Sequence, residues 1–191
     1  MKTKLLFLDT ETTGLDPDKH GVIQVAMLTY DGRELNLKIN PGKGVEYDKE
    51  ALKINGIKKK KIKKFPPHED QFNEMLDFLG EDVNKFDAGD KYLVVGYNVK
   101  FDIDMLHGWA RREGYKYMGS FLDWRVIDVL VLARLAHYLG QMPGEPEDFK
   151  LGTICKLYNI EEPSHDAMTD VEATKSLFEE IIFNWKDEIP F

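Results

Sequence analysis

The sequence predicts an α/β protein with a mixed sheet, antiparallel in its first half and covered by helices on its faces. Two observations predict this class. Three apolar, strand-like stretches come first and are separated by turn residues, and apolar stretches then alternate with helical patterns. No internal repeat and no linker divides the chain, so we expect residues 1–191 to form one domain.

The first half contains the hairpin strands. The apolar run Leu5–Leu8 predicts a buried strand, and Val22–Tyr30 predicts a second one. Asp31-Gly32 is typical of a tight hairpin, and the alternating Arg33–Asn40 stretch predicts a third strand, antiparallel to the second. A short helical piece is expected within Glu46–Ile57.

The second half alternates helices with strands. Apolar residues at helical spacing predict a helix over His68–Leu79, and YLVVG predicts a strand at Tyr92–Gly96. Asp128 is placed to cap a helix over Val129–Tyr138. The remaining expected elements are a helix at Val99–Arg112, a strand within Ser120–Ile127, and helices at Phe149–Tyr158 and Ala167–Trp185.

Composition is that of a soluble globular protein, with 42% hydrophobic and 31% charged residues. No apolar run reaches membrane-spanning length, and Asp9 interrupts the only candidate for a secretory signal. Cys155 is the single cysteine and is expected to be a core thiol, so we expect a cytoplasmic protein without membrane contacts. The net charge of −8 argues against general coating by nucleic acid but permits one local basic groove.

The stretch Lys58–Lys64 departs from this acidic balance, with six lysines in seven positions. A charge run of this kind is commonly a solvated, mobile face. It can equally form an edge that attracts phosphate groups. The sequence favours neither interpretation over the other.

The strongest chemical signal is a pair of carboxylates at the end of the first strand. Strand side chains alternate between faces, so Asp9 and Glu11 point to the same side. Two desolvated acids side by side repel each other, and a divalent cation would remove that cost. An acidic surface turn is the simpler explanation for this pair taken alone.

A second acidic position follows the strand at Tyr92–Gly96. If Val99 opens a helix, Asn98 lies near its cap, and Asp102 lies one turn in, at the sheet edge where α/β proteins usually bind ligands. Asp104 points to nearly the opposite side of such a helix. A solvent-facing acid stabilised by the helix dipole is the alternative for either aspartate.

The third group lies before and within the last helix. His165 and Asp170 are five residues apart, about 140° on a helix, so a regular helix would not direct both to one point. We therefore expect His165 on the preceding loop and Asp170 in the early helical turns, which suits a mobile base beside a fixed metal ligand. Asp166 is expected to cap the helix. An Asp166–Asp170 pair is the alternative, with His165 incidental.

These three groups together resemble the DEDDh group of 3′→5′ exonucleases, a branch of the ribonuclease H-like superfamily that includes polymerase proofreading domains, ribonuclease T and oligoribonucleases. DTETTG at 9–14 matches the first motif, NVKFD at 98–102 the second and HDAMTD at 165–170 the third. The segments ALKINGI at 51–57 and Ile127-Asp128 are also similar to the family. The resemblance implies a mixed five-stranded sheet flanked by helices.

The resemblance also implies the site chemistry. The expected ligands of two Mg²⁺ or Mn²⁺ ions are Asp9, Glu11, Asp102 and Asp170. His165 is expected to act as the general base that takes a proton from the attacking water. The candidate substrate-binding residues are Thr12, Thr13, Leu15, Asn98 and Phe101, although the apolar neighbours of Phe101 also suit a place in the core.

The function implied is metal-dependent hydrolysis of single-stranded nucleic acid from its 3′ end, releasing nucleoside 5′-monophosphates. DNA is the expected substrate. An exoribonuclease or oligoribonuclease is the close alternative, because no residue pattern here shows a contact to the 2′ position. A non-catalytic nucleic-acid-binding domain of the same fold is a further alternative. No sequence feature identifies a polymerase or repair partner.

Overall fold

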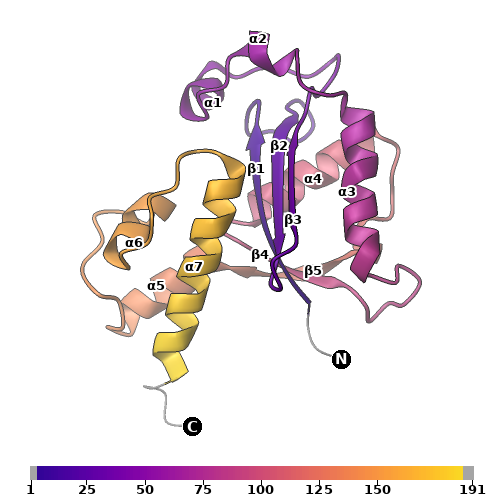
Figure 1. Ribbon diagram of the computed structural model, residues 1–191. Coiled ribbons are helices and arrows are strands. Elements are labelled where there is room, and N and C mark those ends of the chain that lie inside the picture. Colours follow the sequence, from indigo (N-terminus) through magenta and orange to yellow (C-terminus); the bar gives the residue numbers. More distant parts are fainter. Residues whose placement is uncertain (1–3, 187–191) are drawn as a thin grey trace.

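The computed structural model describes residues 4–186, with side chains to residue 183, as a five-stranded sheet flanked by helices (Figure 1). The strands are β1 Lys4–Thr12, β2 Val22–Thr29, β3 Glu34–Lys38, β4 Tyr92–Gly96 and β5 Leu122–Asp128, in the order β3-β2-β1-β4-β5. The pairs β1–β2 and β2–β3 are antiparallel, whereas β1–β4 and β4–β5 are parallel. The predicted mixed sheet is confirmed, and its direction changes at β1.

Two groups of helices cover the sheet. α3 and α4 lie on one side and α5, α6 and α7 on the other (Figure 1). The helices are α1 Lys49–Ile54, α2 Lys59–Ile62, α3 His68–Asp82, α4 Lys100–Arg112, α5 Val129–Tyr138, α6 Leu151–Leu157 and α7 Ala167–Lys186, with a 3₁₀ turn, η1, at Met118–Ser120. α2 and η1 were not predicted. Within residues 4–186, no helix offers an apolar stretch of the length that a membrane span requires.

Alternation along β1 assigns its side chains to the two helical layers. Leu6 and Leu8 are buried in the core cluster under α3 and α4, and Phe7 is buried against α7, where its ring meets Phe178 edge-on at 5.7 Å. Burying a side chain of this size contributes about 1.5–3 kcal/mol. Because the period of a strand is two residues, Asp9 and Glu11 continue the row of Phe7 on the α7 side.

A glycine sets how closely β4 approaches β1. A Cβ atom on Gly96 would lie 2.8 Å from the Leu8 carbonyl oxygen and 2.8 Å from the Val99 side chain, so only glycine fits without movement. Asn98 then adopts a positive φ of 58°, and α4 begins at Lys100, one residue later than predicted. This turn places the first residues of α4 beside the carboxyl end of β1.

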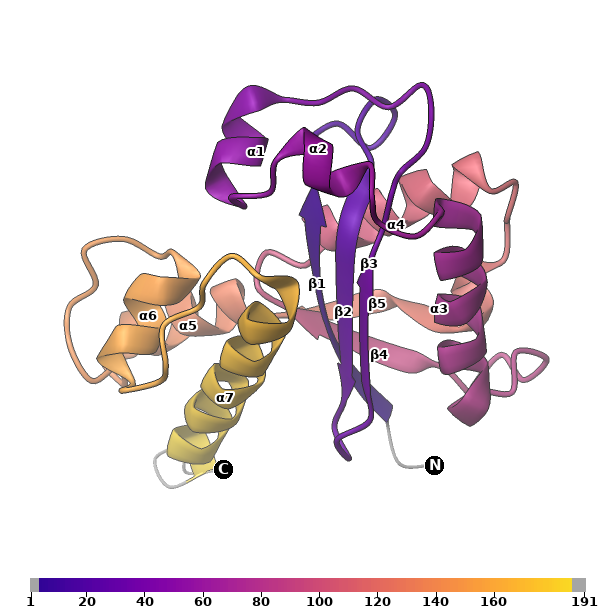
Figure 2. The same ribbon diagram turned by 45° about the horizontal axis from the view of Figure 1, so that its top comes forward.

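The segment that contains α1 and α2 covers the ends of β1 and β2 (Figure 2). The Asp48 carboxylate caps α1 by accepting from the backbone N–H groups of Glu50 and Ala51. Ile57 and Ile62 form a small buried cluster with Ile23 of β2. The carboxyl end of β1 is therefore surrounded by three segments, namely α1–α2, the start of α4 and the start of α7.

Candidate metal centre

Asp102 is attached directly to β1. The backbone N–H and the hydroxyl of Thr10 both donate to Asp102 Oδ1, at 2.9 and 2.7 Å, and Asp102 is 3% exposed. The pairing of β1 with β4 ends at Phe7–Val95. The Thr10 amide therefore has no backbone partner on β4, and it donates to the Asp102 carboxylate instead. The first turn of α4 is thereby fixed beside the strand that carries Asp9 and Glu11.

Glu11, His165 and Asp170 converge from three separate segments. One ligand atom of each lies within 4.8 Å of the other two, an arrangement that can hold a metal ion. Glu11 comes from β1, His165 from the loop before α7, and Asp170 from the first turn of α7. Asp170 is buried, Glu11 is partly buried and His165 is exposed. The predicted placement of His165 on a loop and Asp170 on the helix is confirmed.

Asp166, the residue after His165, fixes the loop that carries His165. Asp166 accepts from the Met168 backbone N–H at 3.2 Å, as a helix cap does. The same carboxylate accepts from Lys38 Nζ at 2.8 Å and from Gln24 Nε2 at 3.1 Å. His165 itself has a positive φ of 57°, a strained region for a residue with a side chain.

Sequence reasoning missed the two residues that hold Asp166. Gln24 is fully buried, and it pairs across the ladder with Glu11. A buried amide in the otherwise apolar stretch VIQVAML is the signal that could have identified it, because buried polar groups need partners. Lys38 gives no comparable signal, since its contact depends on how β3 meets the loop before α7.

The carboxylates of the site raise one another's pKa. The pKa of Asp9 is held well above its ordinary value, first by desolvation and then by repulsion from Asp102, Asp170 and Glu11. Desolvation, together with Asp170 and Asp166, raises the pKa of Glu11 to about 8, although Lys38 opposes the rise. Four acids from three segments thus lie within mutual electrostatic reach.

The pKa values of the other two carboxylates, Asp102 and Asp170, are raised mainly by burial, and local hydrogen bonds oppose the rise. Desolvation raises the pKa of Asp102 to about 7, and the two hydrogen bonds from Thr10 act against that rise. Desolvation also raises the pKa of Asp170, against a hydrogen bond from Thr169 and the nearby His165. Four desolvated oxygen donors fit a hard divalent cation, which would offset their charge.

The remaining predicted site residues lie around this group. Thr12 and Thr13 are buried, and their hydroxyls donate to the carbonyl oxygens of Gly14 at 2.8 Å and Glu46 at 2.6 Å. Leu15 is 78% exposed on the turn that follows.

Asn98 and Phe101 lie on the α4 side of the site. Asn98 is exposed, and its backbone N–H donates to Asp128 Oδ1 at 2.9 Å. Phe101 is partly buried against the core cluster under α3 and α4. The substrate contacts expected of Thr12, Thr13, Leu15, Asn98 and Phe101 stay predictions.

Comparison with known proteins agrees with this geometry. A family model described as exonuclease, RNase_T, matches residues 6–178. The DNA polymerase III subunit epsilon of Rickettsia prowazekii is 28% identical over 177 residues, covering 86% of this chain and 68% of that protein. The ribonuclease T of Wigglesworthia glossinidia brevipalpis is 28% identical over 197 residues, covering 94% of this chain and 84% of that protein.

Solved structures show the same fold. Exonuclease I of E. coli in complex with a dT13 oligonucleotide superposes with a TM-score of 0.81 at 22% identity. The match covers 97% of this chain and 42% of the exonuclease I chain, so this chain spans about two fifths of that protein. A zinc-bound form of the E. coli exonuclease I complex with single-stranded DNA superposes with a TM-score of 0.82 at 22% identity, over 98% of this chain and 42% of that one. The fold is ribonuclease H-like.

Proposed function

This chain belongs to the exonuclease family, and we propose that it is a metal-dependent 3′→5′ exonuclease that releases nucleoside 5′-monophosphates from single-stranded DNA. The observation that carries the proposal is the convergence of Glu11, His165 and Asp170, whose ligand atoms lie within 4.8 Å of one another. Glu11 lies on β1, and Thr10 of the same strand binds Asp102. We take residues 1–191 to act as one exonuclease domain.

The carboxylates would hold the metal. Asp9, Glu11, Asp102 and Asp170 supply oxygen donors that suit two Mg²⁺ or Mn²⁺ ions. Bound there, such ions would offset the charge that develops on the phosphate and make water easier to deprotonate. The raised pKa values of Asp9 and Glu11 support this assignment, because the ligand group is unfavourable without a cation.

His165 would take the proton from the attacking water. It lies within 4.8 Å of the Asp170 and Glu11 ligand atoms, yet it is the exposed member of the three. An exposed imidazole on a loop can receive a proton at the metal centre and pass it to solvent. The contacts of Asp166 with Lys38 and Gln24 orient the loop from which the ring projects.

The substrate class rests on the relatives. The exonuclease I structures are complexes with DNA oligonucleotides, which favours single-stranded DNA for this chain. The relative named ribonuclease T favours RNA as a second candidate. Digestion of DNA and RNA 20-mers of matched sequence, each labelled at the 5′ end, would separate the two. A blocked 3′ end should stop the reaction on either polymer if its direction is 3′→5′.

Three substitutions test the assignment of roles. Asp170→Asn should abolish hydrolysis and weaken Mn²⁺ binding measured by calorimetry, because it removes an anionic ligand. His165→Ala should keep Mn²⁺ binding and the KM for the oligonucleotide but lose about 10²–10⁴-fold in kcat, the contribution of positioned proton transfer. Glu172→Gln, an exposed change on the same helix, is the control.

The outcomes are distinct. Full activity of His165→Ala would remove the histidine from the mechanism. Loss of Mn²⁺ binding in that variant would make His165 a ligand instead. Absence of hydrolysis by the unsubstituted protein with Mg²⁺ or Mn²⁺, on both polymers, would favour a non-catalytic binding domain and refute the proposal.

A further inference from the structure

The lysine patch, defined as Lys58, Lys59, Lys60, Lys61, Lys63 and Lys64, concentrates positive charge in an acidic protein. Residues 43–64 contain nine lysines against three acidic side chains, whereas the whole chain has a net charge of −8. All six lysines of the patch are exposed. Within the described part of the chain, none of the six forms an ion pair with a carboxylate.

The segment that carries the lysine patch is ordered, because it is packed and hydrogen-bonded to the rest of the fold. Ile62, in the middle of the run, is fully buried in the cluster that contains Ile23 and Ile57. The carbonyl oxygen of Lys58 accepts from the N–H groups of Lys61 and Ile62, which closes the turn of α2. After the patch, the Pro66 carbonyl accepts from the Asn40 N–H at 2.8 Å. A mobile, solvated loop would not have these contacts.

The segment before the patch is hydrogen-bonded to the end of β1, the strand that carries Asp9 and Glu11. Asn55 is buried, and its Nδ2 donates to the carbonyl oxygen of Thr12, the residue after Glu11, at 3.1 Å. The Asp48 N–H donates to the Thr13 carbonyl at 2.7 Å. The patch therefore lies at the carboxyl end of β1, above the start of α7 (Figure 2).

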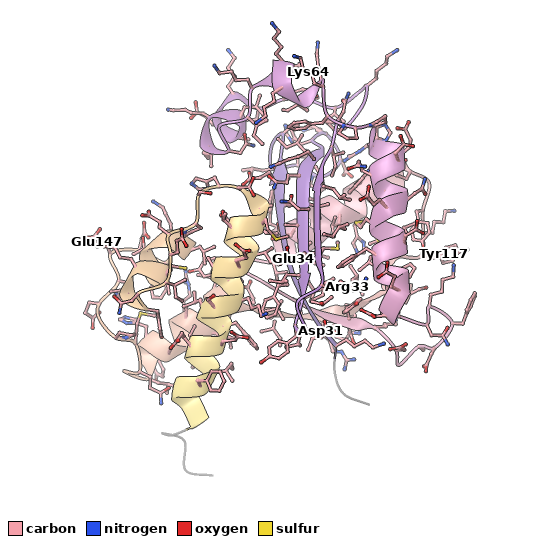
Figure 3. The ribbon with its side chains drawn as sticks, viewed as in Figure 1. Asp31, Arg33, Glu34, Lys64, Tyr117 and Glu147 are labelled. Carbon is pink, nitrogen blue, oxygen red and sulfur yellow. The ribbon has the colours of Figure 1, made fainter. Side chains whose placement is uncertain are left out.

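The lysine patch and the turn of the β2–β3 hairpin lie at opposite ends of the molecule. Figure 3 shows Lys64 at the end of the molecule beyond α2, and it shows Asp31, Arg33 and Glu34 at the opposite end of the β2–β3 hairpin. The positive charge is thus at the carboxyl end of β1, the end that carries Asp9 and Glu11. Elsewhere the acidic surface would repel a polyanion, so the patch provides the attraction that this surface lacks.

We propose that the lysine patch binds the phosphate backbone of the single-stranded substrate upstream of the 3′-terminal nucleotide. This rests on the proposed function, because it assumes that the 3′ end lies in the metal centre. Lysine recognises phosphate as a point charge and carries no base specificity. The patch would therefore raise the affinity for long strands without changing the chemical step.

Salt dependence measures this contact. Each phosphate neutralised on a single strand contributes about 0.7 to the slope of log K against log salt. The test variant replaces Lys60, Lys61, Lys63 and Lys64 with glutamine. The control replaces Lys85, Lys116, Lys150 and Lys156 with glutamine, so that both variants lose four charges but only one loses them at the patch.

Binding is measured by fluorescence anisotropy of a 5′-labelled dT20 oligonucleotide from 50 to 300 mM KCl, with Ca²⁺ as the cation. We expect the slope to fall by about 2–3 in the patch variant, for four lost contacts at most, and to stay within about 0.5 of the parent slope in the control. The kcat/KM for dT20 with Mg²⁺ should fall at least tenfold at 100 mM KCl, and that for the dinucleotide dTpdT should change less than twofold. Lysine-to-arginine changes at the four patch positions should retain the parent slope.

An unchanged slope in the patch variant, or an equal fall in the control, would overturn the proposal and leave the patch as a solvated face or a contact for an acidic protein. An equal loss on dTpdT and dT20 would overturn it too, since the lysines would then act at the reacting end. Failure of the proposed function is seen separately, as no hydrolysis of either dT20 or dTpdT by the parent protein.

Discussion

Removing one charge from the metal centre should stabilise the metal-free protein. Glu11→Gln keeps the shape of the side chain but cannot ionise, so it removes a carboxylate whose pKa is raised from an ordinary 4.5 to about 8. A carboxylate whose pKa is raised in the folded state lowers the stability of that state once the pH exceeds the pKa of the unfolded chain, because the unfolded chain then ionises more readily. The variant should therefore unfold at a higher temperature than the parent when no metal is present.

The magnitude follows from the two pKa values of Glu11. Below pH 4.5 the group is protonated in both states and the variant gains nothing. As the pH rises, the unfolded chain loses the proton first, and stability falls by about 1.4 kcal/mol per pH unit until the folded group also ionises near pH 8. At pH 7 the difference is about 3 kcal/mol as an upper bound, because Glu11 is partly exposed and solvent screens it.

Thermal unfolding in EDTA from pH 4 to pH 9 measures this difference. A difference of about 3 kcal/mol corresponds to about 6–12 °C for a chain of this size. Glu172→Gln, which removes an exposed acid on α7, should change the melting temperature little at any pH. With millimolar Mn²⁺ the parent should regain stability, because the ion binds its folded state. A variant no more stable than the parent at pH 8 in EDTA would refute the raised pKa of Glu11 in the folded state.

Three further substitutions test the residues that position the side chains of the metal centre. Thr10→Val removes the 2.7 Å hydroxyl bond to Asp102 and should lower the free energy of unfolding by about 1.5–3 kcal/mol in urea titrations; no loss would mean that the backbone bond suffices. Lys38→Met should leave stability within about 1 kcal/mol but lower kcat about tenfold at unchanged KM, because Asp166 loses its ion pair beside His165. Gly96→Ala should destabilise by about 1–3 kcal/mol, since its Cβ would meet the Leu8 carbonyl at 2.8 Å; a parental melting temperature would show that β4 can shift at no cost.

Local patterns predicted most of the elements. Tyr92–Gly96 and Val129–Tyr138 were predicted with the bounds that the structure has, because a short apolar run and a capped amphipathic stretch are decided by nearby residues. The helix at Lys59–Ile62 was not predicted, since six lysines give no apolar face. It forms because Ile62 is buried against β2, and burial of that kind depends on residues distant in the sequence.

The sequence by itself determined which side chains are candidates for metal binding and catalysis, and which pairs lie on the same face of a strand. The alternation of β1 places Asp9 and Glu11 together, and the cap at Asp166 fixes the start of α7. These are local properties, decided by the backbone geometry of one strand or one helix end.

Only the tertiary structure decided how the separate groups meet. Thr10 holds Asp102 because β4 stops pairing at Phe7, and Lys38 and Gln24 hold Asp166 because β2 and β3 pass beside the start of α7. Such contacts join residues about 90 to 140 positions apart. Periodicity along the chain cannot specify them, because they follow from how whole layers pack and from which backbone groups the sheet leaves without partners.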